Sequence, residues 1–198
     1  MLNLEKNFLE KRILIYGLGK SGLSTYSFLK KSNAISLFDD RIIAKKKIKD
    51  SLITYKEITK KEFDCIIISP GIDINKCKLS RFLKKNHKKI YTDLDIFYSR
   101  YAFNQKITIT GTNGKSTTAK LLYDILKDQK KDVRLVGNIG NPVLLEKKIK
   151  KDTLFVIEAS SYQLEYSKLF KTNISLILNI SPDHLERHKT INKYVSAK

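Results

Sequence analysis

The sequence Ile107-Thr-Ile-Thr-Gly-Thr-Asn-Gly-Lys-Ser-Thr-Thr118 is the stretch that decides the fold. A β-rich run leads into a glycine loop, and an amphipathic segment over residues 118–127 follows it. A strand, a glycine loop and a helix in this order can cradle phosphates, because the loop amides and the helix N-terminus attract anions. The loop is a shortened variant of the usual phosphate-loop pattern, whose first glycine would fall on Ile109.

Side chains of this loop suit the binding of a nucleoside triphosphate. Lys115 is placed to reach the β- and γ-phosphates, and the hydroxyl of Ser116 or Thr117 is placed to bind magnesium. A chance match is the alternative, but phosphate loops occur between a strand and a helix, as this one does. The predicted ATP-binding residues are Gly111, Thr112, Asn113, Gly114, Lys115, Ser116, Thr117 and Thr118.

Acidic and histidine side chains follow two later apolar runs. Glu158 ends the run 154–157, where a carboxylate commonly faces a magnesium ion on a neighbouring phosphate loop. The alternative for Glu158 is an acid at a strand end without a metal. A second polar cluster follows the run 174–180, where open α/β sheets bind ligands. Its members are Asp183, His184, Glu186, Arg187 and His188.

A second glycine motif, Gly17-Leu-Gly19-Lys-Ser-Gly22, stands between a strand-like run, 12–16, and a helix-like run, 23–31. Its spacing permits a tight turn and a close approach of backbone N–H groups to a pyrophosphate. Asp39 and Asp40 follow about twenty residues later, as acids do in many dinucleotide sites. Alone, the motif indicates a nicotinamide or flavin enzyme, or only a structural turn. It predicts a dinucleotide-like ligand without saying which one.

Strand-like and helix-like runs alternate along the chain, which predicts an α/β fold with parallel strands. We expect a Rossmann-like N-terminal domain over residues 1–95 and a P-loop-type α/β ATPase domain over residues 96–198. A lysine-rich stretch at 45–49 is expected to be a solvated helix or loop. The other predicted strands are 34–38, 63–69, 89–92, 107–110, 133–136, 154–157 and 174–180, with a helix over 79–86. The residues expected to face inward from the helix 118–127 are Leu121, Leu122, Ile125 and Leu126.

Composition excludes several classes of protein. The chain has 198 residues, of which 41% are hydrophobic, so it can bury a core. No apolar run approaches the ~20 residues of a membrane span, and residues 1–12 contain no apolar signal core. Cys65 and Cys77 form no Cys-x-x-Cys pattern, which argues against a disulfide framework and a zinc site. We therefore expect a cytoplasmic protein.

The formal net charge of +19 could indicate nucleic-acid binding, but its distribution argues against it. The basic residues are 33 lysines and only 6 arginines, and arginine is the side chain that grips phosphates and guanine edges in pairs of hydrogen bonds. Residues 1–99 carry +10 and residues 100–198 carry +9, so no segment concentrates the charge. The lysine content is typical of a compositional bias, and no nucleic-acid partner is expected.

Taken together, the motifs resemble the Mur ligases, a family of ATP-dependent amide-forming enzymes of peptidoglycan synthesis. The loop 110–117, an acid after an apolar strand and a histidine after the next are shared with relatives similar to folylpolyglutamate synthetase. Further motifs resemble the branch of the family that adds D-glutamate. They are Gly17-Leu-Gly-Lys-Ser-Gly-Leu-Ser24, Asp40-Arg41, Ser69-Pro-Gly-Ile72, Gly137-Asn-Ile-Gly140, Glu158-Ala-Ser-Ser-Tyr-Gln-Leu-Glu165 and Asn179-Ile-Ser-Pro-Asp-His-Leu-Glu-Arg187.

The resemblance implies a reaction in two steps. ATP phosphorylates the alanyl carboxylate of UDP-N-acetylmuramoyl-L-alanine to an acyl phosphate, and the amine of D-glutamate then displaces phosphate. ATP and Mg²⁺ are the expected cofactors. The first glycine motif would then bind the diphosphate of the UDP-sugar instead of a nicotinamide cofactor, and both ligands present a pyrophosphate to the same kind of cradle.

The resemblance also implies roles for individual residues. Those expected to bind the UDP-sugar are Gly17, Leu18, Gly19, Lys20, Ser21, Gly22, Asp40, Arg41, Ser69, Pro70, Gly71 and Asn138. The expected metal-binding residues are Ser116, Glu158, His184 and, if it is carbamylated, Lys198. The residues expected to act in catalysis are Lys115, Asn138, His184 and Lys198.

Family members have a third, C-terminal domain that binds the amino-acid substrate, and they are roughly twice as long as this chain. We expect this domain to be absent from residues 1–198, which would leave them without activity of their own. Two alternatives to a complete ligase stay open: a non-catalytic nucleotide-binding fragment of one, and a dinucleotide-dependent oxidoreductase. The oligomeric state cannot be derived from the sequence, and a monomer is expected for a full-length member.

Overall fold

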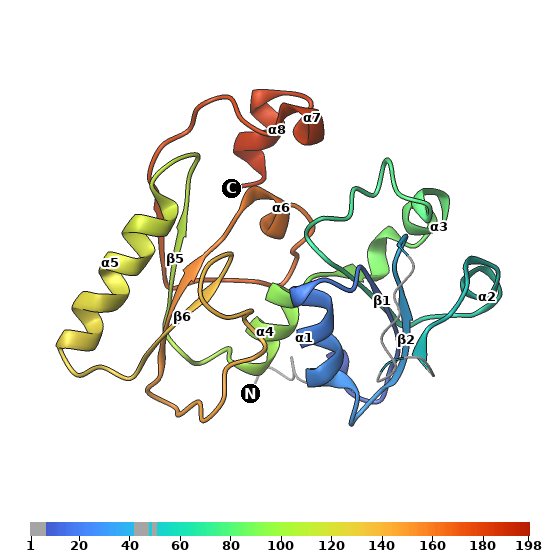
Figure 1. The fold of residues 1–198 in the computed structure, drawn as a ribbon, viewed down its shortest axis with the longest axis horizontal. Helices are drawn as coiled ribbons and strands as arrows, with labels where there is room; N and C mark the ends of the chain where they lie inside the picture. Colours follow the sequence, from blue (N-terminus) through green and yellow to red (C-terminus); the bar gives the residue numbers. More distant parts are fainter. Residues whose placement is uncertain (1–6, 42–47, 49–50) are drawn as a thin grey trace. The chain divides into compact units, whose positions relative to one another are not determined.

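The computed structural model describes residues 7–41, 48 and 51–198, which divide into two compact units, 1–100 and 101–198 (Figure 1). Most of the lysine-rich stretch 45–49 lies outside the described residues. Each unit contains one four-stranded parallel sheet, which confirms the predicted α/β class. In the part of the chain that the structure describes, no helix combines the length and the apolar character that a membrane crossing requires.

The first unit is built on a sheet with the strand order β2-β1-β3-β4. Its strands are β1 (Arg12–Tyr16), β2 (Ala34–Phe38), β3 (Cys65–Ile68) and β4 (Ile90–Tyr91). Its helices are α1 (Lys20–Leu29), α2 (Tyr55–Lys60), α3 (Ser80–Lys85), the 3₁₀ helix η3 (His87–Lys89) and α4 (Asp93–Arg100). Ile13, Leu14 and Ile15 of the internal strand β1 are fully buried, as expected for a strand covered on both faces.

The second unit repeats this plan with the strand order β6-β7-β5-β8. Its strands are β5 (Lys106–Thr110), β6 (Val133–Gly137), β7 (Leu154–Glu158) and β8 (Ile174–Ile177). Its helices are α5 (Lys115–Asp128), α6 (Ser161–Leu164), α7 (Leu185–His188) and α8 (Ile191–Ser196). In both units the strand that leads into the glycine loop, β1 or β5, is internal.

The long helix α5 begins at Lys115, directly after the loop, and packs on the sheet by only part of the face predicted for it. Leu122 and Leu126 contact the core around Ile109 and Val156. The prediction that Leu121 and Ile125 face inward is wrong, since they are 59% and 51% exposed. Ala119 is fully buried, so the contact stripe runs through residues 119, 122 and 126, a spacing of three and four.

Four short helices, α2, α6, α7 and α8, and helix α4 were not predicted. Helix α2 begins with a capping box in which Thr54 and Glu57 exchange hydrogen bonds, and Ser160 and Gln163 form the same motif at α6. These spacings are the signals that could have revealed both helices. Helix α4 crosses the predicted domain boundary between residues 95 and 96, and all of its residues belong to the first unit.

Candidate functional site

The first glycine loop, residues 17–22, connects β1 to α1. A Cβ on Gly22 would lie 1.9 Å from the carbonyl oxygen of Gly17, so only glycine lets the helix approach the strand end this closely. The same carbonyl accepts a hydrogen bond from the hydroxyl of Ser69 (2.7 Å), which follows β3. The loop is thereby fixed to the end of a neighbouring parallel strand, at the sheet edge where α/β folds bind ligands.

A pocket of about 520 Å³ opens at this edge of the first sheet. Its lining comes from three loops, which follow β1, β2 and β3. The lining residues are Gly17, Gly19, Lys20, Ser21, Asp39, Asp40, Arg41, Ser69, Pro70, Gly71 and Ile72. The structure therefore brings together most of the residues predicted to bind the UDP-sugar. Leu18 and Gly22 are buried behind the lining, and Asn138 belongs to the second unit.

Acidic groups hold the loop after β2 in place. Asp39 accepts hydrogen bonds from the backbone N–H groups of Leu18 (2.7 Å) and Arg41 (3.0 Å). Burial acts to raise the pKa of Asp39, but these N–H groups and the Arg41 guanidinium outweigh it, and the pKa is lowered. Asp40 accepts a hydrogen bond from the hydroxyl of Tyr16 (2.7 Å). Asp39, which the glycine motif predicted as an acid of a dinucleotide site but which was not in the expected UDP-sugar set, thus connects the glycine loop to the loop after β2.

The second glycine loop, residues 111–114, carries two lysine amines on its carbonyl groups. Lys115 Nζ donates to the carbonyl oxygens of Gly111 (2.9 Å) and Thr112 (2.6 Å). Lys198 Nζ donates to the same Gly111 oxygen (2.8 Å) and lies near Thr110 Oγ1 (3.2 Å). Burial, and then the charge of Lys115, lower the pKa of Lys198 to about 8. The predicted catalytic lysines therefore converge on one loop.

A buried carboxylate lies beside this loop. Glu158, at the end of β7, has no exposed surface, and its Oε2 accepts a hydrogen bond from Ser116 Oγ (2.9 Å). Its Oε1 accepts from Asn138 Nδ2 (2.9 Å). Strand β7 lies between β5 and β6, so the residue that ends it sits between the loops that follow both neighbours. Gly137 is required here, since a Cβ on it would lie 2.2 Å from the Glu158 carbonyl oxygen.

His184 lies in a separate cluster of the second unit. Its ring lies 4.7 Å from that of Tyr162, and its nitrogens lie 3.5 Å from Asp183 Oδ2 and 3.7 Å from Glu186 Oε1. No contact joins His184 directly to Glu158 or Ser116 among the described residues, where no group of three His, Cys, Asp or Glu side chains is arranged to hold a metal ion. Of the four predicted metal-binding residues, Ser116 and Glu158 are the pair in direct contact.

Two residues that support the second loop, Asn179 and Tyr194, were not among the predicted site residues. Asn179 exchanges two hydrogen bonds with the backbone of Asn113, and Tyr194 contacts Thr112 Oγ1 through its hydroxyl (3.0 Å). His188 is buried, with Nε2 lying 3.0 Å from Ser161 Oγ, and burial lowers its pKa. Asn179 belongs to a motif that carries the family resemblance, which was the available signal. Nothing in the sequence distinguishes the buried His188 from the half-exposed His184.

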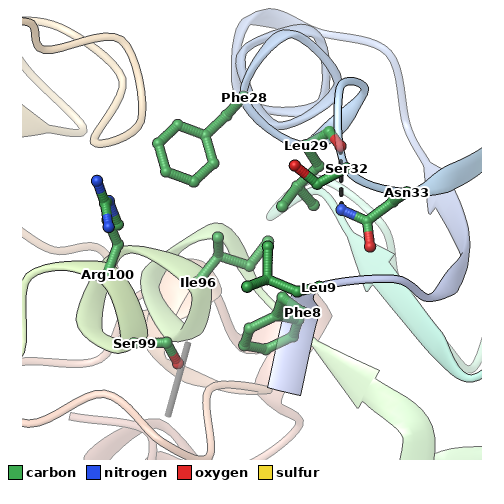
Figure 2. A pocket seen from close by; sticks show the side chains of 9 residues that line it. All are labelled: Phe8, Leu9, Phe28, Leu29, Ser32, Asn33, Ile96, Ser99 and Arg100. Atoms are coloured by element: carbon green, nitrogen blue, oxygen red, sulfur yellow. Dashed lines mark hydrogen bonds between the residues drawn. The ribbon is translucent and has the colours of Figure 1, made fainter. Parts of the chain in front are cut away.

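The first unit contains a second pocket, of about 280 Å³ (Figure 2). Its lining residues are Phe8, Leu9, Phe28, Leu29, Ser32, Asn33, Ile96, Ser99 and Arg100. The amide of Asn33 donates to the Leu29 carbonyl (3.0 Å), and Ser99 donates to the Asp95 carbonyl (2.9 Å). Five of these lining residues are apolar (Phe8, Leu9, Phe28, Leu29 and Ile96), and Arg100 is the charged side chain among them.

Comparisons with known proteins agree with this division of the chain. A model of the Mur ligase MurD-like N-terminal domain matches residues 11–90, and a model of the Mur ligase middle domain matches residues 109–198. A protein named UDP-N-acetylmuramoylalanine--D-glutamate ligase from Rickettsia bellii is 36% identical over 194 residues, which cover 96% of this chain and 42% of that protein. Its namesake from Caldicellulosiruptor bescii is 40% identical over 205 residues, covering 95% and 44%.

Solved structures share the fold at low sequence identity. The UDP-N-acetylmuramate:L-alanyl-gamma-D-glutamyl-meso-diaminopimelate ligase from Neisseria meningitides is 14% identical, with a TM-score of 0.60 over 95% of this chain and 66% of that one. The UDP-N-acetylmuramate-alanine ligase from Thermotoga maritima is 19% identical, with a TM-score of 0.54 over 95% and 46%. This chain spans less than half the length of the two curated relatives. Because models of two consecutive domains match it in order, the chain belongs to the Mur ligase family.

Proposed function

We propose that the chain forms the UDP-sugar-binding and ATP-binding parts of a cytoplasmic ligase that joins D-glutamate to UDP-N-acetylmuramoyl-L-alanine. The observation that carries the proposal is the contact between buried Glu158 and Ser116, the residue after the loop lysine. A buried carboxylate costs free energy unless it is paired or binds a cation. Glu158 lies beside a phosphate loop, so its carboxylate is suited to bind the magnesium ion of a nucleotide held there.

The residues present fit Mg²⁺ and ATP. Carboxylate and hydroxyl oxygens are the ligands that Mg²⁺ prefers, and Glu158 and Ser116 supply both kinds. Bound Mg²⁺ would neutralise charge on the phosphates during phosphoryl transfer. The loop amides and the N-terminus of α5 would hold the phosphates, and Lys115 would leave the carbonyls of Gly111 and Thr112 to contact them. Asn138 would hold Glu158 in place and lie near the reacting carboxylate.

His184 and Lys198 would contribute to a second cation site in the closed enzyme. Carbamylation of Lys198 requires a neutral amine, and a pKa of about 8 makes a larger fraction of this amine neutral at pH 7 than for an exposed lysine. In the first unit, the 520 Å³ pocket would bind the UDP-sugar, with its diphosphate at the N-terminus of α1 and its uracil near Asp40 and Arg41.

The proposal is tested on the full-length protein. The assay measures D-glutamate-dependent phosphate release in the presence of ATP, Mg²⁺ and UDP-N-acetylmuramoyl-L-alanine. We expect Lys115→Ala to reduce turnover by about 100- to 1000-fold, because it removes a cation from the transferring phosphoryl group. Lys120→Ala is the matched control, since this exposed lysine of the same helix pairs with Asp124. Activity of Lys115→Ala within threefold of the parent would overturn the role of the loop.

Residues 1–198 alone are expected to bind both nucleotides without turnover. Isothermal titration with ATP, with the UDP-sugar and with NADH distinguishes the alternatives. Tight binding of NADH, together with no binding of the UDP-sugar, would favour an oxidoreductase instead.

A further inference from the structure

Asp93 is a buried carboxylic acid in contact with the first glycine loop, and the proposed function does not use it. It is 3% exposed and stands at the first residue of α4. Its Oδ1 accepts a hydrogen bond from the backbone N–H of Leu94 (3.0 Å), and its Oδ2 is bonded to the hydroxyl of Ser21. Ser21 in turn lines the 520 Å³ pocket. Asp93 is therefore one hydrogen bond away from a residue that lines this pocket.

The proton balance of this pair depends on the charge of Asp93. An ionised carboxylate only accepts hydrogen bonds, so the single hydroxyl proton of Ser21 must point to Asp93. Ser21 then presents only lone pairs to the pocket, where the oxygens of a diphosphate also need donors. A neutral Asp93 instead donates its own proton to Ser21 Oγ, and the hydroxyl proton of Ser21 becomes available to a phosphate oxygen.

The surroundings of Asp93 shift its protonation equilibrium toward the neutral form, without the ligand. Burial raises the pKa of its carboxyl group above the ordinary value, and the hydrogen bonds from Ser21 and Leu94 offset this only in part. Asp95, the other acid on α4, raises the pKa further. From α1, the contacting group is the Ser21 hydroxyl, with Lys20 next to it in sequence. A diphosphate in the pocket would add negative charge near Asp93 and favour its neutral form again.

We propose that Asp93 is a positioning residue that takes up a proton when the diphosphate of a UDP-sugar binds, and so turns Ser21 into a donor toward that diphosphate. This inference rests on the proposed function of the first glycine loop. The proton comes from the buffer and forms an O–H bond on Asp93, and no other bond is made or broken. The ligand therefore binds more tightly at low pH.

The sign of the effect follows from linkage. The pKa of Asp93 is higher in the complex than in the free protein, so affinity falls as the pH rises from the free value to the bound value. Each unit of difference between the two pKa values corresponds to about a tenfold loss of affinity across that range. Because the pKa of free Asp93 is already raised, the loss falls above the ordinary carboxyl range near pH 4.

The test is isothermal titration of residues 1–198 with UDP-N-acetylmuramoyl-L-alanine between pH 5.5 and 8, in buffers of different ionisation enthalpy. The diphosphate and the alanyl carboxylate of this ligand stay ionised throughout that range. The parent chain is expected to take up a fraction of a proton and to lose affinity as the pH rises. In Asp93→Asn, the side-chain amide donates to Ser21 at every pH. This variant is expected to take up less of a proton on binding, and its affinity for the ligand should vary by no more than about twofold between pH 5.5 and 8.

Asp95→Asn is the matched control, because Asp95 accepts from the Thr92 N–H (2.8 Å) and its replacement leaves Asp93 able to titrate. It should retain the proton uptake, at a somewhat lower pH, since the charge of Asp95 raises the pKa of Asp93. If Asp93→Asn does not fold, Asp93→Ser provides a second uncharged variant. Equal proton uptake by the parent and the uncharged variant, or none by the parent, would overturn the inference alone. Failure of the parent to bind the UDP-sugar would overturn the proposed function and this inference with it.

Discussion

The two glycine loops of this chain join an internal strand to a helix in the same way, yet their backbones are held by opposite kinds of group. In the first loop, an N–H of Leu18 donates to the carboxylate of Asp39, and the carbonyl of Gly17 accepts from a neutral hydroxyl. In the second, the carbonyl of Gly111 accepts from two lysine amines. Cations thus gather at the second loop, beside a buried acid.

This difference indicates separate tasks for two loops of similar topology. A ligand whose phosphates do not react needs a cradle of fixed shape, which the uncharged and acidic partners of the first loop provide. A phosphoryl group in transfer needs mobile or bound cations, because charge moves during the step. This contrast supports the proposed assignment of the UDP-sugar to the first loop and of ATP to the second.

The largest effect is expected at Gly22, where the first loop has no room for a side chain. In Gly22→Ala, the new Cβ would lie 1.9 Å from the Gly17 carbonyl oxygen, so strand, loop and helix must shift. We expect a loss of about 3 kcal/mol in the free energy of unfolding, together with loss of UDP-sugar binding. Urea denaturation and titration with the UDP-sugar measure the two losses.

Gly19→Ala is the matched control in the same loop. A Cβ on Gly19 would meet no atom of the described residues within 4 Å, and Gly19 has a φ of −72° that alanine also adopts. Its stability should stay within about 1 kcal/mol of the parent. Equal costs for the two variants would show that the loop does not depend on the close contact at Gly22.

The sequence was sufficient to predict strands whose ends are marked by polar or glycine residues. Strands β1 and β2 begin and end at the predicted residues, because each is a short β-rich run with polar or glycine residues after it. Most residues that line the pocket of the first loop were also among those named from the sequence, since glycine spacing and parallel strand ends determine where loops converge.

Buried charge is what the sequence could not reveal. Asp93, Asp95 and Lys106 are buried although their types are mostly exposed, and each is held by hydrogen bonds that arise only in the folded unit. Helix α4 was missed for this reason, because its two acids resemble a polar linker. The exposure of Leu121 was missed because the helix period alone does not say how wide the covered stripe is.

The first residues of β1 and β5, the strands that lead into the two glycine loops, provide a second contrast. The expected effect on the free energy of unfolding is intermediate. Arg12 begins β1 on the surface, whereas Lys106 begins β5 with 1% exposure. Lys106 Nζ donates to the carbonyls of Tyr101 and Asn104, and burial lowers its pKa to about 8. The unfolded state, with an ordinary lysine pKa near 10.4, binds more protons between these values, so stability rises with pH there.

Comparison with Lys106→Met isolates this contribution. Between pH 7.5 and 10, the unfolding free energy of the parent should rise by about 2 kcal/mol relative to the variant. The variant also leaves carbonyl groups without a donor at every pH, so the slope and not the level is compared. Lys120→Met, at an exposed site, should show the slope of the parent. Parallel curves for the parent and Lys106→Met would contradict a buried, titrating lysine.

The smallest effect is expected at the surface counterpart, Asp64→Asn. Arg12 donates to both carboxylate oxygens of Asp64, and these bonds lower the pKa of Asp64 to about 2. A lowered carboxyl pKa stabilises the folded state above the ordinary pKa near 4, and this contribution is lost as the pH falls from 4 to 2. Exposed pairs are screened by water and salt, so the thermal midpoint at pH 7 should fall by only about 2 °C or less.

Differential scanning calorimetry of the parent, Asp64→Asn and the control Glu62→Gln, each at low and high salt, measures this shift. Glu62 Oε2 lies 3.6 Å from the Arg12 guanidinium, so its removal should matter less than that of Asp64. The midpoints of the parent and Asp64→Asn should converge as the pH falls from 4 to 2, because the parent carboxylate becomes increasingly protonated over that range. A difference that does not shrink between pH 4 and pH 2 would mean that Asp64 supports β1 through its hydrogen bond to the Arg12 backbone (2.8 Å) and not through charge.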